Sequence, residues 1–569
     1  MGIQKNGVRL KINPTAGRHR GYPAFAALTI CCLVLAILLS APWSTVWAAA
    51  PTGECADGKS CVIENFAFTG NDPRLPAMRE NVVAKKKTAW EESLGGQLAA
   101  KAHIQARLRG WPQRFLVDRQ TLPTADRAFL EQLARDTWRG IAALSDRENG
   151  LPIDNLRLAD GSVAVADARI GDYASGTNIG LYLIATVAAQ DLGFIERGPA
   201  LDRIRKVLDT LGRLETYRGL FFNFYDTTSL ERTSNFVSFV DSSWLAAGLI
   251  VVRQAFPELY APASELINRT DYSFFYNRDR RLISHGYYVN LQRRSPFDYG
   301  VLFTEARLGS LIAIGKGDVP RDVWFAMIRT FPGDCEGQTM TPMASMRKSV
   351  DGHTVAAGYY EWGGMRYVPS WGGSMFEALM PTLVLDEQRY APKSLGRNGH
   401  VHATIQQRYA SEQLGYPVWG LSPSATPDGL SYGEYGVRVL GSFGYGGGPV
   451  TPHASALALA VMPDAAITNL RALVQRYDVY GDFGLYDALD PQSGAVAHKY
   501  LILDQAMLFV AAANHLSGGT IPKRFAADPM IQTVLPMIAV EDFFEGAPAR
   551  EQARAGNDQA SGEAVSSNQ

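Results

Sequence analysis

Residues 175–195 read SGTNIGLYLIATVAAQDLGFI, and this segment contains the start, the body and the end of one helix. Thr177 is suited to the N-terminal cap, because its hydroxyl can accept a hydrogen bond from a backbone N–H of the first turn. Gly193 is suited to the C-terminal end, since glycine readily adopts the left-handed conformation common there. The segment therefore predicts a helix over residues 178–191.

Helical segments of the same kind recur along the chain, although their sequences do not repeat. Thr124 and Asp126 open a helix that runs through Trp138, and Ile204 and Leu208 belong to the apolar face of the next one. Strand-like alternation is rare and short. The pattern predicts an all-α domain, with further helices over residues 244–256, 302–314, 375–385, 402–414, 454–462, 467–476 and 500–515.

The connections between these helices are long and rich in glycine, aromatic and acidic residues. Examples are FFNFYDTTS (221–229), YYEWGGMRYVPSWGGS (359–374) and GYPVWGLSPSATPDGLSYGEYG (415–436). Loops longer than about 12 residues are usually functional or disordered. Because these loops contain so many Trp and Tyr residues, we expect a ring of helical hairpins with functional loops gathered at one mouth.

The composition is that of a large, nearly neutral globular chain. It has 569 residues, with 55 Lys and Arg against 56 Asp and Glu, which argues against binding to nucleic acid. The 24 Tyr and 10 Trp residues suit a surface that stacks on sugar rings. A large aromatic core would explain them equally well.

The first 50 residues have the three parts of a secretory signal peptide. Basic residues lie between residues 2 and 22, an apolar run (AFAALTICCLVLAILL) covers 24–39, and Ala48 to Ala50 offer a small-residue cleavage site. The alternative is an uncleaved anchor that attaches the N-terminus to the inner membrane. In both cases the chain from residue 51 is exported, which predicts a periplasmic or otherwise extracytoplasmic protein.

Three further parts are expected: a lead segment over 51–120, a helical domain over 121–544 and a disordered tail over 545–569. Cys55 and Cys61 flank a polar loop and could form a disulfide in an oxidising compartment. Cys335 is then a buried thiol. No Cys or His spacing resembles a zinc site, so we expect neither a metal nor a cofactor.

Seven segments, in order, resemble proteins of β-1,2-glucan metabolism. Residues 175–195 are similar to the S-P-T-N-I-G-L helix in the C-terminal domain of cyclic β-1,2-glucan synthases. Residues 237–256 (VSFVDSSWLAAGLIVVRQAF) resemble both a synthase segment and the V-E-T-x-F-L-x-x-G-L segment of bacterial endo-β-1,2-glucanases. The resemblance implies a glucoamylase-like (α/α)6 toroid over roughly 130–530, and it continues through residues 304–320, 370–384, 419–425, 484–491 and 500–514.

Cleavage of a glycosidic bond usually needs two carboxyl groups, one of which is protonated near neutral pH. Glu305 is the first candidate, because it lies on the apolar face of its helix and matches the synthase S-E-A-R-L segment; an ion pair with Arg307 or with another arginine is the alternative. Glu377 is the second, although Ser374 and Glu377 also form a capping-box pattern. Asp241 aligns with the glucanase glutamate, and its alternative role is to cap the following helix.

Other residues are candidates for binding sugar. Asp504 and Gln505 lie inside an apolar helix, where carboxylates are uncommon, and Asp504 could instead brace a loop. Asn178 lies in the first turn of its helix. The loops add three acids and five aromatic platforms for pyranose faces, each with a solvated or core alternative: Asp172, Glu361, Glu434, Trp362, Trp371, Trp419, Tyr287 and Tyr432.

The chain departs from the resemblance at one position. The synthase segment G-I-S-E-S-A carries a glutamate where this chain has Pro423. The resemblance and the candidate carboxyl groups nevertheless lead us to expect an exported glycoside hydrolase acting on a β-glucan or another envelope polysaccharide. The alternatives are a non-catalytic carbohydrate-binding or scaffold protein, which Pro423 favours, and a transglycosylase.

Overall fold

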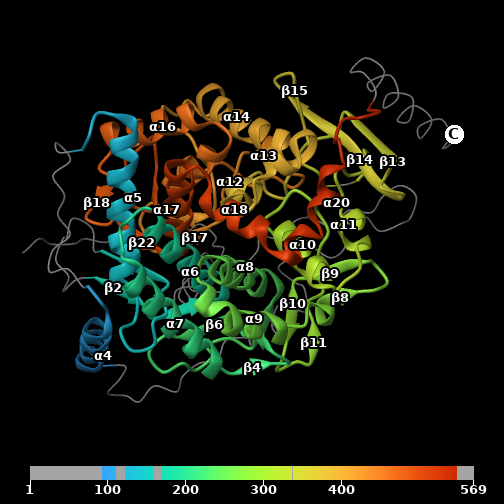
Figure 1. The fold of residues 1–569 in the computed structure, drawn as a ribbon. Helices are drawn as coiled ribbons and strands as arrows, with labels where there is room; N and C mark the ends of the chain where they lie inside the picture. Colours follow the sequence, from blue (N-terminus) through green and yellow to red (C-terminus); the bar gives the residue numbers. More distant parts are fainter. Residues whose placement is uncertain (1–92, 111–121, 159–167, 336, 548–569) are drawn as a thin grey trace, which may run out of the picture. The chain divides into compact units, whose positions relative to one another are not determined.

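Six helices form a closed inner ring in the computed structural model, which describes residues 93–110, 122–158, 168–335 and 337–547 (Figure 1). Neighbouring helices around the ring pack against each other. The contact between α10 and α12 includes Arg307, whose guanidinium donates to the carbonyls of Glu377 and Ala378. The ring consists, in order, of α6 (Gly176–Asp191), α8 (Phe239–Ala255), α10 (Ala306–Lys316), α12 (Met375–Leu379), α15 (Pro452–Leu457) and α17 (Ile502–Ser517).

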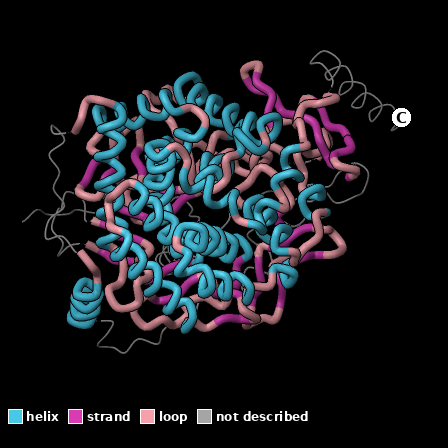
Figure 2. The backbone as a smooth tube through the Cα atoms, viewed as in Figure 1, coloured by secondary structure: helices cyan, strands magenta, loops and turns pink. Residues whose placement is uncertain are grey.

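One outer helix precedes each inner helix in the chain. This alternation is that of an (α/α)6 toroid, so the expected fold class is confirmed. Figure 2 shows that helices dominate the described chain. The outer layer consists of α5 (Asp126–Ala143), α7 (Arg197–Arg213), α9 (Tyr260–Arg269), α11 (Asp322–Ala326), α14 (Arg397–Glu412) and α16 (Pro463–Arg476).

The distribution of apolar residues explains which helices lie inside. Residues 176–189 of α6 are all buried, because this helix is apolar around its whole circumference. Helix α7 buries only one face, which includes the predicted Ile204 and Leu208. A helix with a single apolar face can lie only at the surface of the ring.

Several predicted helix boundaries were wrong. The helices predicted to begin at residues 244, 302, 402 and 467 begin at Phe239, Ala306, Arg397 and Pro463. Ser175, not Thr177, caps α6, since its hydroxyl accepts from the backbone N–H of Asn178. The helix predicted over 375–385 ends at Leu379 and continues as a 3-10 helix over Met380–Leu383. Pro381 explains this change, because proline has no N–H to continue the α-helical pattern.

The long connections contain more strand structure than the sequence predicted, all of it antiparallel and most of it two or three residues long. The exception is the hairpin of β13 (Ala344–Val350) and β14 (His353–Trp362) with β15 (Met365–Tyr367). Alternation is hard to see in β14 because both of its faces are largely buried. The pairs that flank the ring are β1 (Asn155–Arg157) with β22 (Lys499–Leu501), β3 (Tyr173–Ser175) with β6 (Phe224–Asp226), β7 (Phe236–Ser238) with β10 (Gly286–Tyr288), and β16 (Ser424–Ala425) with β17 (Tyr432–Gly433).

Two buried ion pairs hold the C-terminal region against the rest of the domain. Arg253 on α8 pairs with Asp528, and Arg329 pairs with Glu541. These acids belong to the C-terminal region that contains α18 (Thr520–Ala527), α19 (Pro529–Gln532) and α20 (Leu535–Ala539). The carboxyl end of the domain is therefore fixed to the ring rather than loosely attached.

Several predictions fall wholly or partly outside the described residues. These are the signal peptide or anchor over 1–50, the Cys55–Cys61 disulfide and most of the tail. The lead segment contributes α4 (Leu94–Arg107), where Arg107 pairs with Asp146 of the helical domain. Among the helices that could be assessed, none combines the length and apolarity needed to cross a bilayer.

Helices α6 and α8 approach so closely that a glycine is required between them. A Cβ added to Gly180 would lie 2.2 Å from the carbonyl oxygen of Trp244, which is backbone and cannot rotate away. We expect Gly180→Ala to lower the free energy of unfolding by at least about 2 kcal/mol, measured by urea denaturation. Gly212→Ala is the matched control, because its Cβ would meet nothing within 4 Å. Equal stability of the two variants would contradict this packing.

Candidate active site

The N-terminal ends of the six inner helices carry the polar side chains of the ring. Because inner and outer helices alternate, the inner helices run in one direction and begin at one end, which we call the mouth. The partial positive charge of a helix N-terminus favours acidic groups there. The first turns, or the residues just before them, supply Asn178, Asp241, Glu305, Glu377, His453 and Asp504.

Glu305 directly precedes α10 and is only 3% exposed. Its Oε2 atom has no hydrogen-bond partner. Burial raises the pKa of Glu305 to about 8, and the charge of Glu377 adds to the shift. Glu305 is therefore a carboxyl group that stays protonated at neutral pH and has a free oxygen.

The expected alternative for Glu305, an ion pair with Arg307, is wrong. The Arg307 Nε atom lies 2.7 Å from Oε1 of Glu387, and both side chains are buried. Arg307 also donates to backbone carbonyls at the start of α10 and in α12. It joins two inner helices and leaves Glu305 without a close cationic partner.

Glu377 forms the capping box expected from the sequence. Its carboxylate accepts hydrogen bonds from the Ser370 hydroxyl and from the backbone N–H groups of Gly372 and Ser374. Burial raises the pKa of Glu377, while these donors act in the opposite direction. Because these groups all donate hydrogen bonds to the Glu377 carboxylate, the ionised form is the one that this cradle fits.

Asp241 lies in the first turn of α8, and Ser238 rather than Asp241 caps that helix. Its Oδ1 atom accepts a hydrogen bond of 2.6 Å from the Thr177 hydroxyl of α6. Burial raises the pKa of Asp241, and its charge contributes to the raised pKa of Glu305. Glu305, Glu377 and Asp241 therefore share one side of the mouth, which we call the Glu305 wall.

Two tyrosines that the sequence did not single out line this wall. Burial raises the pKa of Tyr299, and the charges of Glu305 and Asp241 raise it further. Burial likewise raises the pKa of Tyr445, with contributions from Glu377 and Glu434. Tyr299 follows an unremarkable loop and carried no signal, whereas Tyr445 lies in the glycine-rich segment GSFGYGGG.

A second acidic group, which we call the Asp504 wall, contains Asp504, Asp487 and Asp154. Asp504 is 2% exposed, its carboxyl group lies beside that of Asp487, and His453 Nδ1 lies 3.3 Å from its Oδ2 atom. Burial raises the pKa of Asp504, and the charges of Asp487 and Asp154 raise it further. Helix α17 is three helices from α10 in either direction around the ring, so this wall faces the Glu305 wall.

Several predicted binding residues belong to the Asp504 wall. Asn178 donates a hydrogen bond of 2.9 Å to Asp154. Burial raises the pKa of Tyr432, and Asp504 and Glu434 raise it further, which places both loop residues near this wall. Gln505 donates to the Leu485 carbonyl, while its Oε1 atom is buried without a partner.

The remaining predicted residues lie elsewhere. Asp172 accepts hydrogen bonds from Thr227 and Thr228, and therefore braces a loop. Trp419 and Trp371 are largely buried, and the Trp371 ring packs on Phe443. The structure places three predicted residues on strands: Glu361 and Trp362 on β14 beside α14, and Tyr287 on β10.

Pro423 immediately precedes β16, which pairs with the strand that carries Tyr432. The residue that replaces the synthase glutamate thus lies in the loop next to the Asp504 wall. Within the described ranges, no group of three or more His, Cys, Asp or Glu residues is arranged to hold a metal ion.

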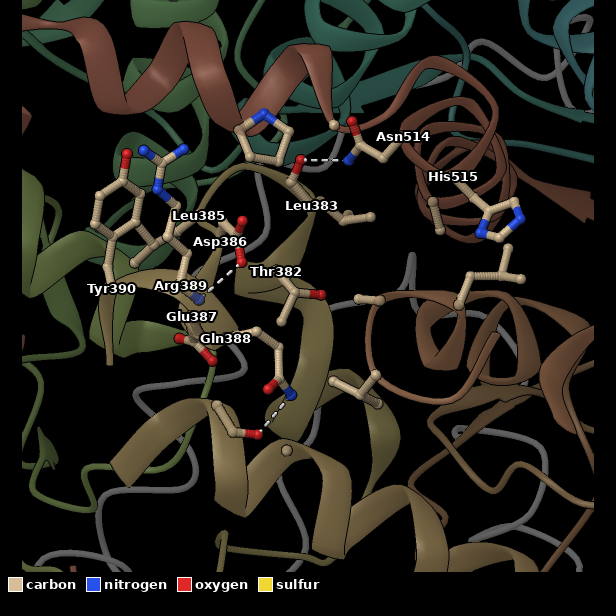
Figure 3. Close-up of a pocket in the computed structure, with 18 of the residues that line it drawn as sticks. Thr382, Leu383, Leu385, Asp386, Glu387, Gln388, Arg389, Tyr390, Asn514 and His515 are labelled. Atoms are coloured by element: carbon tan, nitrogen blue, oxygen red, sulfur yellow. Dashed lines mark hydrogen bonds between the residues drawn. The ribbon is translucent and has the colours of Figure 1, made fainter. Parts of the chain in front are cut away.

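A cavity of about 240 Å³ lies at the opposite ends of the inner helices (Figure 3). It is lined by residues such as Leu383, Asp386, Asn514 and His515, and the Asn514 amide donates to the Leu383 carbonyl. None of the carboxyl groups of the two walls lines this cavity. It is therefore separate from the acidic mouth.

Solved structures of other proteins share this fold. An endo-β-1,2-glucanase from Chitinophaga pinensis, in complex with sophorotriose and glucose, superposes with a TM-score of 0.58 at 18% identity, covering 73% of this chain and 99% of the enzyme. An endo-β-1,2-glucanase from Talaromyces funiculosus bound to β-1,2-glucan gives 0.57 at 12% identity, covering 76% and 94%. Residues 342–529 also match the Glycoamylase family, described as "Putative glucoamylase".

The chain has a glucoamylase-like fold. The resemblance expected from the sequence is confirmed by a curated relative, the cyclic β-(1,2)-glucan synthase NdvB of Rhizobium meliloti. The two are 25% identical over an alignment of 552 residues. The alignment covers 71% of this chain and 18% of the synthase. The glucoamylase-like chain thus spans about one fifth of the length of that relative.

Proposed function

We propose that this glucoamylase-like chain is an exported glycoside hydrolase that cleaves a β-glucan of the β-1,2-linked kind. One observation carries the proposal: Glu305 is a buried carboxyl group with a free oxygen and a pKa of about 8, in a mouth lined by other carboxyl groups. The similarity to β-1,2-glucanases supports the substrate class. The basic and apolar N-terminal sequence supports export.

Glu305 acts as the general acid in this proposal. It transfers its proton to the glycosidic oxygen while the bond from that oxygen to the anomeric carbon breaks. Asp241 supplies the second carboxylate, which either takes a proton from the attacking water or attacks the carbon itself. Glu377, whose oxygens are held by Ser370, Gly372 and Ser374, keeps a negative charge near Glu305 and so maintains the raised pKa.

The reaction catalysed is tested by incubating the exported chain with linear and cyclic β-1,2-glucans. Hydrolysis predicts new reducing ends and shorter products. A transglycosylase would redistribute chain lengths without new reducing ends, and a binding protein would retain the glucan unchanged. Pro423, in place of the synthase glutamate, favours the binding protein as the second candidate, so unchanged glucan after days of incubation would replace the proposal with it.

The pH dependence follows from the raised pKa of Glu305. Because the acid must be protonated, we expect kcat on β-glucan to persist through neutral pH and to fall as the pH rises through about 8. An acid with an ordinary glutamate pKa would lose activity near pH 4 to 5. An aryl glycoside, whose leaving group needs little protonation, is the control substrate. Its kcat should not fall as the pH rises through about 8. An identical decline of kcat for both substrates would show that a group other than Glu305 causes it.

A further inference from the structure

A cationic surface lies next to the mouth, on strands β8 (Tyr276–Asn277), β9 (Leu282–Ser284), β10 and β11 (Arg293–Arg294). Residues 276–294 contain five arginines and one acid, although the whole chain has a net charge of -1. Strand β10 pairs with β7, which leads directly into the helix that carries Asp241. The surface is therefore one strand away from the start of helix α8 (Figure 1).

Two stacked tyrosines form the centre of this surface. The rings of Tyr217 and Tyr287 lie 5.5 Å apart at an angle of 14°, and Phe274 meets Tyr287 edge-on at 4.9 Å. All three side chains are partly exposed. A flat, partly exposed aromatic pair of this kind can receive the apolar face of a pyranose ring.

Two arginines flank the aromatic pair. Arg218 lies 5.3 Å from the Phe274 ring, and Arg294 is the cross-strand neighbour of Tyr287. Burial raises the pKa of Tyr287, and the charges of both arginines oppose that shift, so both guanidinium groups are near its hydroxyl. We call Tyr217, Tyr287, Phe274, Arg218 and Arg294 the rim patch.

The backbone at Arg218 is unusual. Arg218 and Gly219 form the turn between β4 (Thr216–Tyr217) and β5 (Leu220–Phe221), with φ angles of 53° and 79°. Such turns favour Asn, Asp or Gly at the first position, and a long side chain there costs on the order of 1 kcal/mol. An arginine at this position places a positive charge beside the aromatic pair in spite of that cost.

Arg280 of this surface pairs with Asp298, whereas no ion pair is found among the described residues for the other arginines of the surface. Some exposed arginines elsewhere pair with acids, as Arg197 does with Glu258 and Arg408 with Glu412. In the described part of the chain, no ion pair is found for Arg218, Arg293 or Arg294, and Arg294 instead donates to the Tyr276 carbonyl. Their charge is available to a ligand.

We propose that the rim patch binds sugar residues that carry an anionic substituent, a carboxylate or a phosphate, on the glycan whose neutral part occupies the mouth. The tyrosine pair holds the pyranose face, and the guanidinium groups bind the anion. The two acidic walls repel an anionic sugar, so charged residues are directed to the rim. The inference rests on the proposed function only in taking a glucan as the ligand.

The test measures binding to linear β-1,2-glucan and to the same polymer after partial carboxymethylation. Glu305→Gln is the background in every variant, so that turnover does not interfere. We expect tighter binding of the carboxymethylated polymer, with an advantage that shrinks as salt is added. Arg218→Ala combined with Arg294→Ala should lower the ratio of the two affinities about tenfold. Tyr217→Ala combined with Tyr287→Ala should weaken binding of both polymers.

Arg347→Ala combined with Arg476→Ala is the charge-matched control, because both arginines are exposed and lie outside the rim patch. This control should retain the preference. Equal binding of both polymers by the background protein, or equal loss in the control, would overturn the proposal. Stronger binding to heparin or to phosphatidylglycerol vesicles than to the carboxymethylated glucan would also overturn it. Because binding is measured without turnover, the two proposals can fail separately. If the parent chain does not hydrolyse β-1,2-glucan but the preference for the carboxymethylated polymer is found, only the proposed hydrolase is refuted.

Discussion

Glu305→Gln is expected to lose about 10²–10⁴-fold of kcat on β-glucan, because glutamine cannot donate a proton to the departing oxygen. The substitution keeps the size of the side chain, so substrate binding should change little. Reducing-end release under saturating substrate measures the loss. Activity on an aryl glycoside should fall much less, since that leaving group departs without a proton.

The matched control is Glu541→Gln, which changes a buried glutamate that pairs with Arg329 rather than one that lines the mouth. It should lower stability and leave kcat per folded molecule unchanged. Full activity of Glu305→Gln would remove Glu305 from the mechanism.

Glu305 should also reduce the stability of the enzyme at alkaline pH. Its pKa in the folded chain is about 8, above the ordinary glutamate value, so the folded state binds more protons than the unfolded state between these values. The contribution of Glu305 to the free energy of unfolding is greatest at acidic pH and is lost as the pH rises toward 8. We therefore expect Glu305→Gln to gain on the order of 2–4 kcal/mol over the parent at pH 8 to 9, and much less near pH 4.

Arg307→Leu is expected to lower the free energy of unfolding by about 3–5 kcal/mol, measured by urea denaturation at neutral pH. The substitution leaves the buried carboxylate of Glu387 without its partner and frees the carbonyls of Glu377 and Ala378. It also removes the link between α10 and α12, which carry Glu305 and Glu377. We therefore expect kcat to fall as well, even in the fraction that remains folded.

The double variant Arg307→Leu with Glu387→Leu separates charge from packing. Replacing a buried pair by apolar side chains is often close to neutral, so the double variant should recover much of the lost stability. Recovery of stability without recovery of kcat would identify Arg307 as a positioning residue. If the double variant is as unstable as the single one, the buried carboxylate is not the cause.

Local patterns predicted the helical architecture well. The largely apolar segment at 178–191 and the one-sided face of Ile204 and Leu208 distinguish an inner from an outer helix, since each pattern is set within a few turns. The strand β14 was missed because burial on both of its faces hides the alternation. The cap of α6 was misplaced by two residues, since Ser175 and Thr177 are both suitable capping residues.

The sequence by itself determined that apolar helices would recur along the chain and that acidic residues would stand at or near the first turns of four of them, because periodicity and capping act over short distances. Only the tertiary structure decided which acids are free. Arg307 is two residues from Glu305 in the chain, yet it pairs with Glu387, which is 80 residues further on. That choice depends on how α10 and α12 pack, and it leaves Glu305 buried, unpaired and protonated at neutral pH.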